Sequence, residues 1–200
     1  MKTLIIIPSR LSATRLPGKP LLKINGLSII SHVVKRAQEA EIGEVFVAAE
    51  DQEIIEEVNK NGGQAILTHK QHKSGTDRIY EALEKLSKPD IDLIINLQGD
   101  EPLMSKEDIK NLHDQMIKTK SNFGTLATII KKKRILSEQS VVKVITRDSF
   151  KNSQFPEAVS FIRTSDEKSE NIYHHLTPNR GSSQYWNNSY SELYQTHLPI

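Results

Sequence analysis

The sequence predicts an α/β protein in which helices cover both faces of a mostly parallel sheet. Short runs rich in isoleucine and valine alternate with stretches of helical period, as in parallel strands joined by crossover helices. The 200 residues suffice for one hydrophobic core, and the absence of cysteine excludes disulfides, thiolate metal clusters and a cysteine nucleophile. Ligands of such sheets bind outside the carboxyl ends of the strands, where we expect the functional loops.

Four apolar runs predict the strands of the sheet, and a fifth closes the regular part of the chain. The first run is apolar throughout after Thr3, which is typical of a strand buried on both faces. The fourth run has no polar residue between Asp92 and Asn96. In chain order, the predicted strands lie at residues 3–7, 44–49, 65–68, 92–97 and 125–130.

Amphipathic helices are expected between these strands, because apolar residues recur there at helical spacing. Asp51 and Ser105 are candidate N-caps, and Ser105 is followed by Asp108 at the capping-box position. Asn61-Gly62-Gly63 supplies residues that tolerate the left-handed conformation at a helix end. The predicted helices cover residues 29–37, 51–60, 79–86 and 105–117.

The charge balance argues against a nucleic-acid binder. Twenty-seven Lys and Arg stand against 25 Asp and Glu, and the net charge of +2 leaves no general basic surface. The basic run at 131–134 is better explained as a solvated turn. No apolar run approaches the roughly 20 residues of a membrane span. We expect no membrane insertion, no secretory signal and a cytoplasmic location.

The loop after the first strand, residues 8–21, is rich in cations. Arg10, Arg15 and Lys19 share it with a glycine and three hydroxyl side chains. Paired cations and oriented amides stabilise clustered negative charge, so the loop suits a polyphosphate. It lacks the Walker pattern and the dinucleotide fingerprint. The alternative is an ordinary solvated loop with scattered cations.

The segment 98–102 follows the apolar fourth strand and brings a carboxylate to the mouth of the sheet. Magnesium usually takes one or two protein carboxylates together with substrate phosphates. Asp100 is therefore the candidate ligand for a magnesium ion that arrives with a nucleotide. A simple turn at Gly99-Asp100 is the alternative.

The segment 72–78 precedes the third helix and offers hydroxyls, a flexible backbone and an arginine, all usable for base or sugar recognition. Capping of the helix by Ser74 or Thr76 explains it equally well. His69 and His72 have the spacing of a metal pair, but no further ligand cluster supports one, and surface histidines are the better explanation.

Taken together, the segments 8–21, 72–78 and 96–102 resemble the 3-deoxy-manno-octulosonate (Kdo) cytidylyltransferases in order and spacing. Weaker matches at 125–127, 142–144 and His175 extend the resemblance to residue 176. The resemblance implies a three-layer nucleotide-diphospho-sugar transferase-like, Rossmann-like fold. It also implies transfer of a cytidylyl group from CTP to Kdo, with release of pyrophosphate and Mg²⁺ as cofactor, in lipopolysaccharide biosynthesis.

The resemblance also assigns roles to residues. Arg10 and Lys19 would act with Asp100 in catalysis, and Asp100 would bind the magnesium. Arg78 and His175 would face the carboxylate of the sugar acid. The substrate-binding residues implied in this way are Pro8, Ser9, Arg15, Ser74, Gly75, Thr76, Arg78, Gln98 and His175.

The chain departs from the family pattern near its end. We expect residues 1–176 to form a nucleotidyltransferase domain with a complete nucleotide-binding half and an incomplete sugar-binding and dimer part. Residues 177–200 are expected to be an atypical tail, as after a frameshift or early stop. Members of the family form homodimers, and the altered tail argues against a homodimer for this chain. Two alternatives stay open: a CTP-binding remnant without turnover, and activation of another acidic sugar such as sialic acid.

Overall fold

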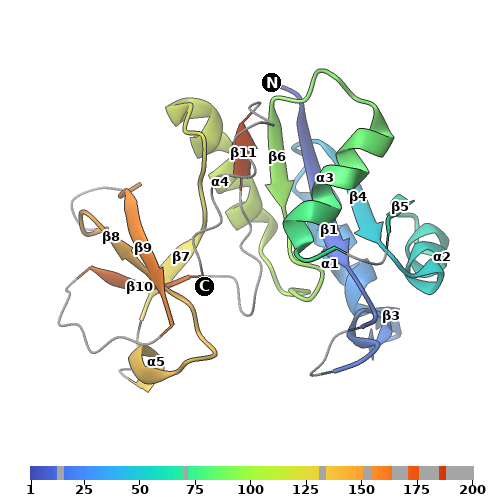
Figure 1. Cartoon of the computed structure of the whole chain (residues 1–200), viewed down its shortest axis with the longest axis horizontal. Helices are drawn as coiled ribbons and strands as arrows, with labels where there is room; N and C mark the ends of the chain where they lie inside the picture. Colours follow the sequence, from blue (N-terminus) through green and yellow to red (C-terminus); the bar gives the residue numbers. More distant parts are fainter. Residues whose placement is uncertain are drawn as a thin grey trace. The chain divides into compact units, whose positions relative to one another are not determined.

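The computed structural model describes residues 1–12, 16–69, 72–130, 134–150, 155–163, 171–175 and 185–187. The chain divides into two compact units (Figure 1). The first comprises residues 1–124 together with 183–200, and the second comprises residues 125–182. A membrane-spanning helix is absent from the described part of the chain.

The first unit is built on a five-stranded sheet in the order β11-β6-β1-β4-β5. Strand β1 is parallel to both β4 and β6, and β5 continues the parallel arrangement beyond β4. Only β11 runs antiparallel, against β6. The mostly parallel sheet predicted from the sequence is therefore confirmed. Its strands are β1 (Thr3–Ser9), β4 (Glu44–Ala49), β5 (Ala65–Leu67), β6 (Leu93–Asn96) and β11 (Tyr185–Asn187).

Helices cover both faces of this sheet, as predicted. Helix α3 packs on one face, where its Ile79 and Leu83 join Leu4 and Ile6 of β1 in a buried apolar cluster. Helix α1 packs on the opposite face and contacts α2 and α4 (Figure 1). The bounds are α1 (Ile29–Glu39), α2 (Gln52–Lys60), α3 (Gly75–Leu86) and α4 (Lys106–Thr119). The short elements η1 (Lys19–Leu21), β2 (Lys23–Ile24) and β3 (Leu27–Ser28) precede α1.

The second unit contains a four-stranded sheet in the order β7-β10-β8-β9, in which every pairing is antiparallel. The expectation that regular structure ends near residue 130 is therefore wrong. These strands are only three to five residues long, and β7 and β9 are largely exposed, so the sheet carries no long apolar run. The elements are β7 (Ala127–Ile129), α5 (Arg134–Ser137), β8 (Lys143–Thr146), β9 (Ala158–Ile162) and β10 (Ile172–His175).

Lys143 on β8 is the most unusual core residue of the second unit, because it is fully buried. Its ammonium group donates to the main-chain carbonyl of Glu138 at 2.6 Å and to that of Arg163. Burial lowers the pKa of the Lys143 ammonium group. The side chain thus ties the turn before β8 to the end of β9.

Replacement of Lys143 by alanine is expected to destabilise the second unit by about 3 kcal/mol, because a large buried side chain and a donor to two carbonyls are lost together. Hydrogen exchange of the β8 and β9 amides measures this loss locally. The matched control is Lys110→Ala on the exposed side of α4, for which we expect a change below about 0.5 kcal/mol. Equal exchange in Lys143→Ala and wild type would contradict the role assigned to the buried ammonium group.

Candidate functional site

The predicted loops meet at the carboxyl end of β1, where two glycines pack closely on Pro8. A Cβ added at Gly75 would lie 3.2 Å from Pro8 Cγ, and one added at Gly99 would lie 3.0 Å from the Pro8 carbonyl oxygen. A side chain at either position would require Pro8 to shift by a few tenths of an ångström, whereas glycine allows the approach directly. The segments 72–78 and 98–102 are therefore held against the end of the first strand, as the sequence predicts.

The two charged candidates of this edge form an ion pair. Lys19 Nζ lies 2.7 Å from Asp100 Oδ2, and each side chain is 34% exposed, so both groups remain accessible to a ligand. Lys19 is placed by the short helix η1, which begins after Gly18 in the left-handed conformation at φ 72°. The Gly18 amide donates to the Leu11 carbonyl at 3.0 Å and closes the loop that starts after β1.

Glu101, next to Asp100, is a buried carboxyl group that no pattern in the sequence predicts to be functional. It is 8% exposed, and both of its carboxyl oxygens lack a hydrogen-bond partner within the described structure. Burial, and secondarily the neighbouring Asp100 charge, raises the pKa of Glu101 to about 8, although Lys19 opposes the shift.

These carboxyl groups fit a magnesium ion that is shared with phosphates rather than enclosed by protein. Asp100 offers accessible oxygens, and Glu101 adds two oxygens without partners. The described residues contain no group of three or more His, Asp or Glu side chains arranged to hold a metal. One or two carboxylates with phosphate oxygens complete the shell that magnesium prefers.

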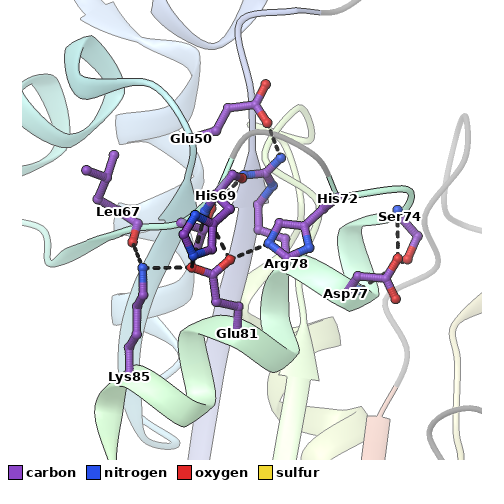
Figure 2. Close-up of polar contacts among 10 residues, drawn as sticks. Glu50, Leu67, His69, His72, Ser74, Asp77, Arg78, Glu81 and Lys85 are labelled. Atoms are coloured by element: carbon purple, nitrogen blue, oxygen red, sulfur yellow. Dashed lines mark hydrogen bonds and ion pairs between the residues drawn. The ribbon is translucent and has the colours of Figure 1, made fainter.

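The start of α3 resolves the two interpretations of Ser74. Its hydroxyl accepts from the Asp77 amide at 3.2 Å, and the Asp77 carboxylate accepts from the Ser74 amide at 3.1 Å, so the two residues form a capping box (Figure 2). The Ser74 side chain is thus a helix cap. The amides of Gly75 and Thr76 belong to the first helical turn, which has no intrahelical acceptors for them. They are the donors that this helix end can present to an anion.

Arg78 lies elsewhere than the resemblance implies. Its side chain is only 3% exposed, and its guanidinium group pairs with Glu50 (Figure 2). It also donates to Thr68 Oγ1 at 2.6 Å and to the His69 carbonyl at 3.2 Å. The structure directs these donors to protein acceptors inside the unit, so it gives no support to the expectation that Arg78 faces the sugar carboxylate.

Glu50 and Asp51, at the end of β4, anchor the loop that follows β1. Glu50 accepts from the Ser12 hydroxyl at 3.0 Å, and Asp51 accepts from the Leu11 amide at 2.7 Å. Asp51 stands at the N-cap position of α2, but its side chain makes no cap hydrogen bond. The sequence signal that could have revealed Glu50 resembles the one that revealed Asp100: a charged residue within a few positions of the end of a buried parallel strand.

Glu81 on α3 is the centre of a second polar cluster, which lies beside the segment 72–78 (Figure 2). Its carboxylate accepts from the His69 amide at 3.0 Å, bonds to the His72 ring and lies 2.7 Å from Lys85 Nζ. Desolvation raises the pKa of Glu81, but the bonds from Lys85, His69 and His72 outweigh it and lower that pKa to about 2. His69 is exposed, as expected, whereas His72 is 17% exposed and tied to Glu81.

The remaining candidates are placed only in part. Arg10 is exposed just after β1, whereas Ser9 is buried at the end of that strand. The Gln98 amide donates to Asn96 Oδ1 at 3.0 Å. Arg15 lies outside the described residues. His175 is described only by its place on β10 of the second unit, opposite Ala127.

Comparison with known proteins supports the sequence-based interpretation. A family model for cytidylyltransferases matches residues 4–198, so the match continues beyond residue 176, where the sequence analysis ends the resemblance. Two curated relatives are the 3-deoxy-manno-octulosonate cytidylyltransferases of Rhodopseudomonas palustris (strain BisB18), 44% identical over 146 residues, and Thermodesulfovibrio yellowstonii, 45% identical over 151 residues. Each alignment covers 72% of this chain, which spans 59% of each relative's length.

Solved structures agree. The CMP:2-keto-3-deoxy-manno-octonic acid synthetase complexed with CTP superposes with a TM-score of 0.78 at 34% identity, covering 94% of this chain and 74% of that protein. A 4-diphosphocytidyl-2C-methyl-D-erythritol synthase, 13% identical, has a TM-score of 0.58 over 93% of this chain and 75% of its own, and this likeness concerns the fold alone.

Proposed function

We propose, since the chain belongs to the cytidylyltransferase family and resembles its Kdo-activating members, that it transfers the cytidylyl group of CTP to Kdo. The observation that carries the proposal is the accessible Lys19–Asp100 pair, 2.7 Å apart, at the carboxyl end of the parallel sheet. A cation and a carboxylate at this position suit a nucleoside triphosphate and its metal ion.

In the proposed reaction, the anomeric hydroxyl oxygen of Kdo attacks the α-phosphorus of CTP. The bond from this phosphorus to the bridging oxygen breaks, and pyrophosphate leaves while the hydroxyl proton is released. The negative charge that shifts toward the leaving group requires positioned cations. Lys19 and Arg10 are proposed to supply them, and the Gly75 and Thr76 amides to orient the nucleotide.

Magnesium is proposed as the cofactor, with Asp100 as its protein ligand and Glu101 beside it. When bound, the ion neutralises phosphate charge and orients the triphosphate. The further proposal is that the product serves lipopolysaccharide biosynthesis. We also propose a cytoplasmic location, because the nucleotide substrate is an intracellular metabolite.

Pyrophosphate release from CTP and magnesium tests the function, measured with and without Kdo. We expect release that depends on Kdo, with CMP-Kdo as the second product. Sialic acid in place of Kdo is the matched alternative substrate, and we expect little release with it. Thermal stabilisation by CTP without pyrophosphate release would contradict the transferase and leave a nucleotide-binding protein.

A further inference from the structure

Two charged side chains of the first unit are buried and form an ion pair with each other. Neither has a place in the substrate contacts proposed above. The side chains of Arg78 and Glu50 are 3% and 7% exposed, and they form an ion pair between α3 and the end of β4 (Figure 2). Removing two charges from water is costly, and an apolar pair of similar volume is often as stable or more stable. Stability alone therefore does not account for this pair.

The hydrogen bonds of the pair extend to both loops of the proposed nucleotide site. Glu50 uses its second oxygen to accept from Ser12, at 3.0 Å, in the loop that leads to Lys19. Arg78 uses its other terminal nitrogen to donate to Thr68 Oγ1 and the His69 carbonyl, where the chain leaves β5 toward the segment 72–78. The ion pair thus connects the loop after β1 with the loop after β5.

The connection is rigid in a way that a single hydrogen bond is not. A guanidinium group is planar with fixed donor directions, so bonds to Glu50, Thr68 and His69 together determine its orientation. Asp51, the neighbour of Glu50, adds a 2.7 Å bond to the Leu11 amide on the same loop. A shift of either loop would therefore break bonds at the buried pair.

We infer that Glu50 and Arg78 are positioning residues that hold the two nucleotide-binding loops at a fixed separation and thereby set the affinity for CTP. The inference rests on the proposed function for the identity of the ligand. Neither side chain is required to touch the nucleotide. A displacement of about 1 Å in a binding group can cost about a hundredfold in rate, so the effect of losing the pair should be large.

The test uses the double variant Glu50→Leu/Arg78→Met, which replaces the pair by apolar side chains and leaves no buried charge unpaired. We expect no large loss of its free energy of unfolding, because no buried charge is left unpaired, although Thr68 and the His69 carbonyl lose their donor. Its dissociation constant for CTP, titrated in the presence of magnesium, should nevertheless rise by about tenfold or more. Glu50→Gln should lose both stability and CTP affinity, because it leaves the Arg78 charge buried without its counter-ion.

Val58→Ala is the matched control for stability. Val58 lies in the core on α2, so this variant is destabilised by lost packing, and its dissociation constant for CTP should equal that of wild type. Wild-type CTP affinity in Glu50→Leu/Arg78→Met would overturn the inference and leave the pair a purely structural one.

Hydrogen exchange separates this inference from the proposed function. In the double variant, the amides of residues 9–12 and 72–78 should exchange faster together, whether or not the protein binds CTP. If wild type does not bind CTP, the proposed function fails, and joint exchange of the two segments still reports their coupling. Faster exchange in only one segment, or in neither, would overturn the coupling itself.

Discussion

Asp100→Asn is expected to lower the rate of Kdo-dependent pyrophosphate release by about 10²- to 10³-fold, because the magnesium ion that stabilises charge developing on the phosphates would lose its proposed carboxylate ligand. The substitution preserves the shape of the side chain but removes the carboxylate that faces Lys19 at 2.7 Å. It also removes the proposed protein ligand of magnesium. Steady-state assays at saturating CTP measure the change in turnover.

The same variant should leave the fold intact. Each partner of the Lys19–Asp100 pair is 34% exposed, and pairs of this kind contribute at most about 1 kcal/mol to stability. Asp90→Asn is the matched control, because Asp90 forms a surface ion pair with Lys2 away from the site. We expect wild-type turnover in that control. Turnover in Asp100→Asn within twofold of wild type would refute the role of this carboxylate.

Glu81→Gln is expected to reduce the free energy of unfolding by about 3 kcal/mol at pH 7, the value that corresponds to a pKa lowered from 4.5 to about 2. The sign follows from proton binding. Above pH 4.5 the carboxylate is charged in both folded and unfolded states, and the folded state holds it with Lys85, His69 and His72. As the pH falls from 4.5 to 2, the unfolded state takes up the proton first, and this stabilisation is lost.

Urea unfolding at a series of pH values measures this effect as a difference between variants. The stability gap between wild type and Glu81→Gln should be widest above pH 4.5 and should close as the pH approaches 2. Glu84→Gln is the control, because Glu84 is exposed on the same helix and should show no such pH-dependent gap. A gap that stays constant down to pH 2 would show that packing rather than charge explains the loss.

Periodicity was sufficient to predict the parallel strands and the main helices of the first unit, but not β11, which lies in the segment 177–200 that was expected to be an atypical tail. Strands β1, β4 and β6 are buried along nearly their whole length, so each contains an uninterrupted apolar run, at residues 4–7, 45–49 and 93–95. Right-handed crossovers and parallel pairing then bring the carboxyl ends of these strands to one edge. Lys19 and Asp100, 81 positions apart, could be predicted to meet there for that reason.

Apart from β7, which the apolar run at 125–130 predicts, the second unit escaped prediction because its strands are short and β9 is largely exposed. Val159 and Phe161 of β9 are 58% and 42% exposed, so the strand has neither a continuous apolar run nor a clean alternation. Antiparallel pairing with β8 defines it. Pairing of this kind depends on a partner distant in the chain, which a local pattern cannot identify.

The sequence by itself determined the α/β architecture of the first unit, the edge at which its loops gather and the residue types that suit a triphosphate there. Only the tertiary structure decided which charges face outward. The family resemblance implies a substrate contact for Arg78, yet Glu50, Thr68 and His69 pair its guanidinium group inside the unit. The physical reason is that burial of an ion depends on partners supplied by other segments, whereas strand and helix patterns are properties of one segment.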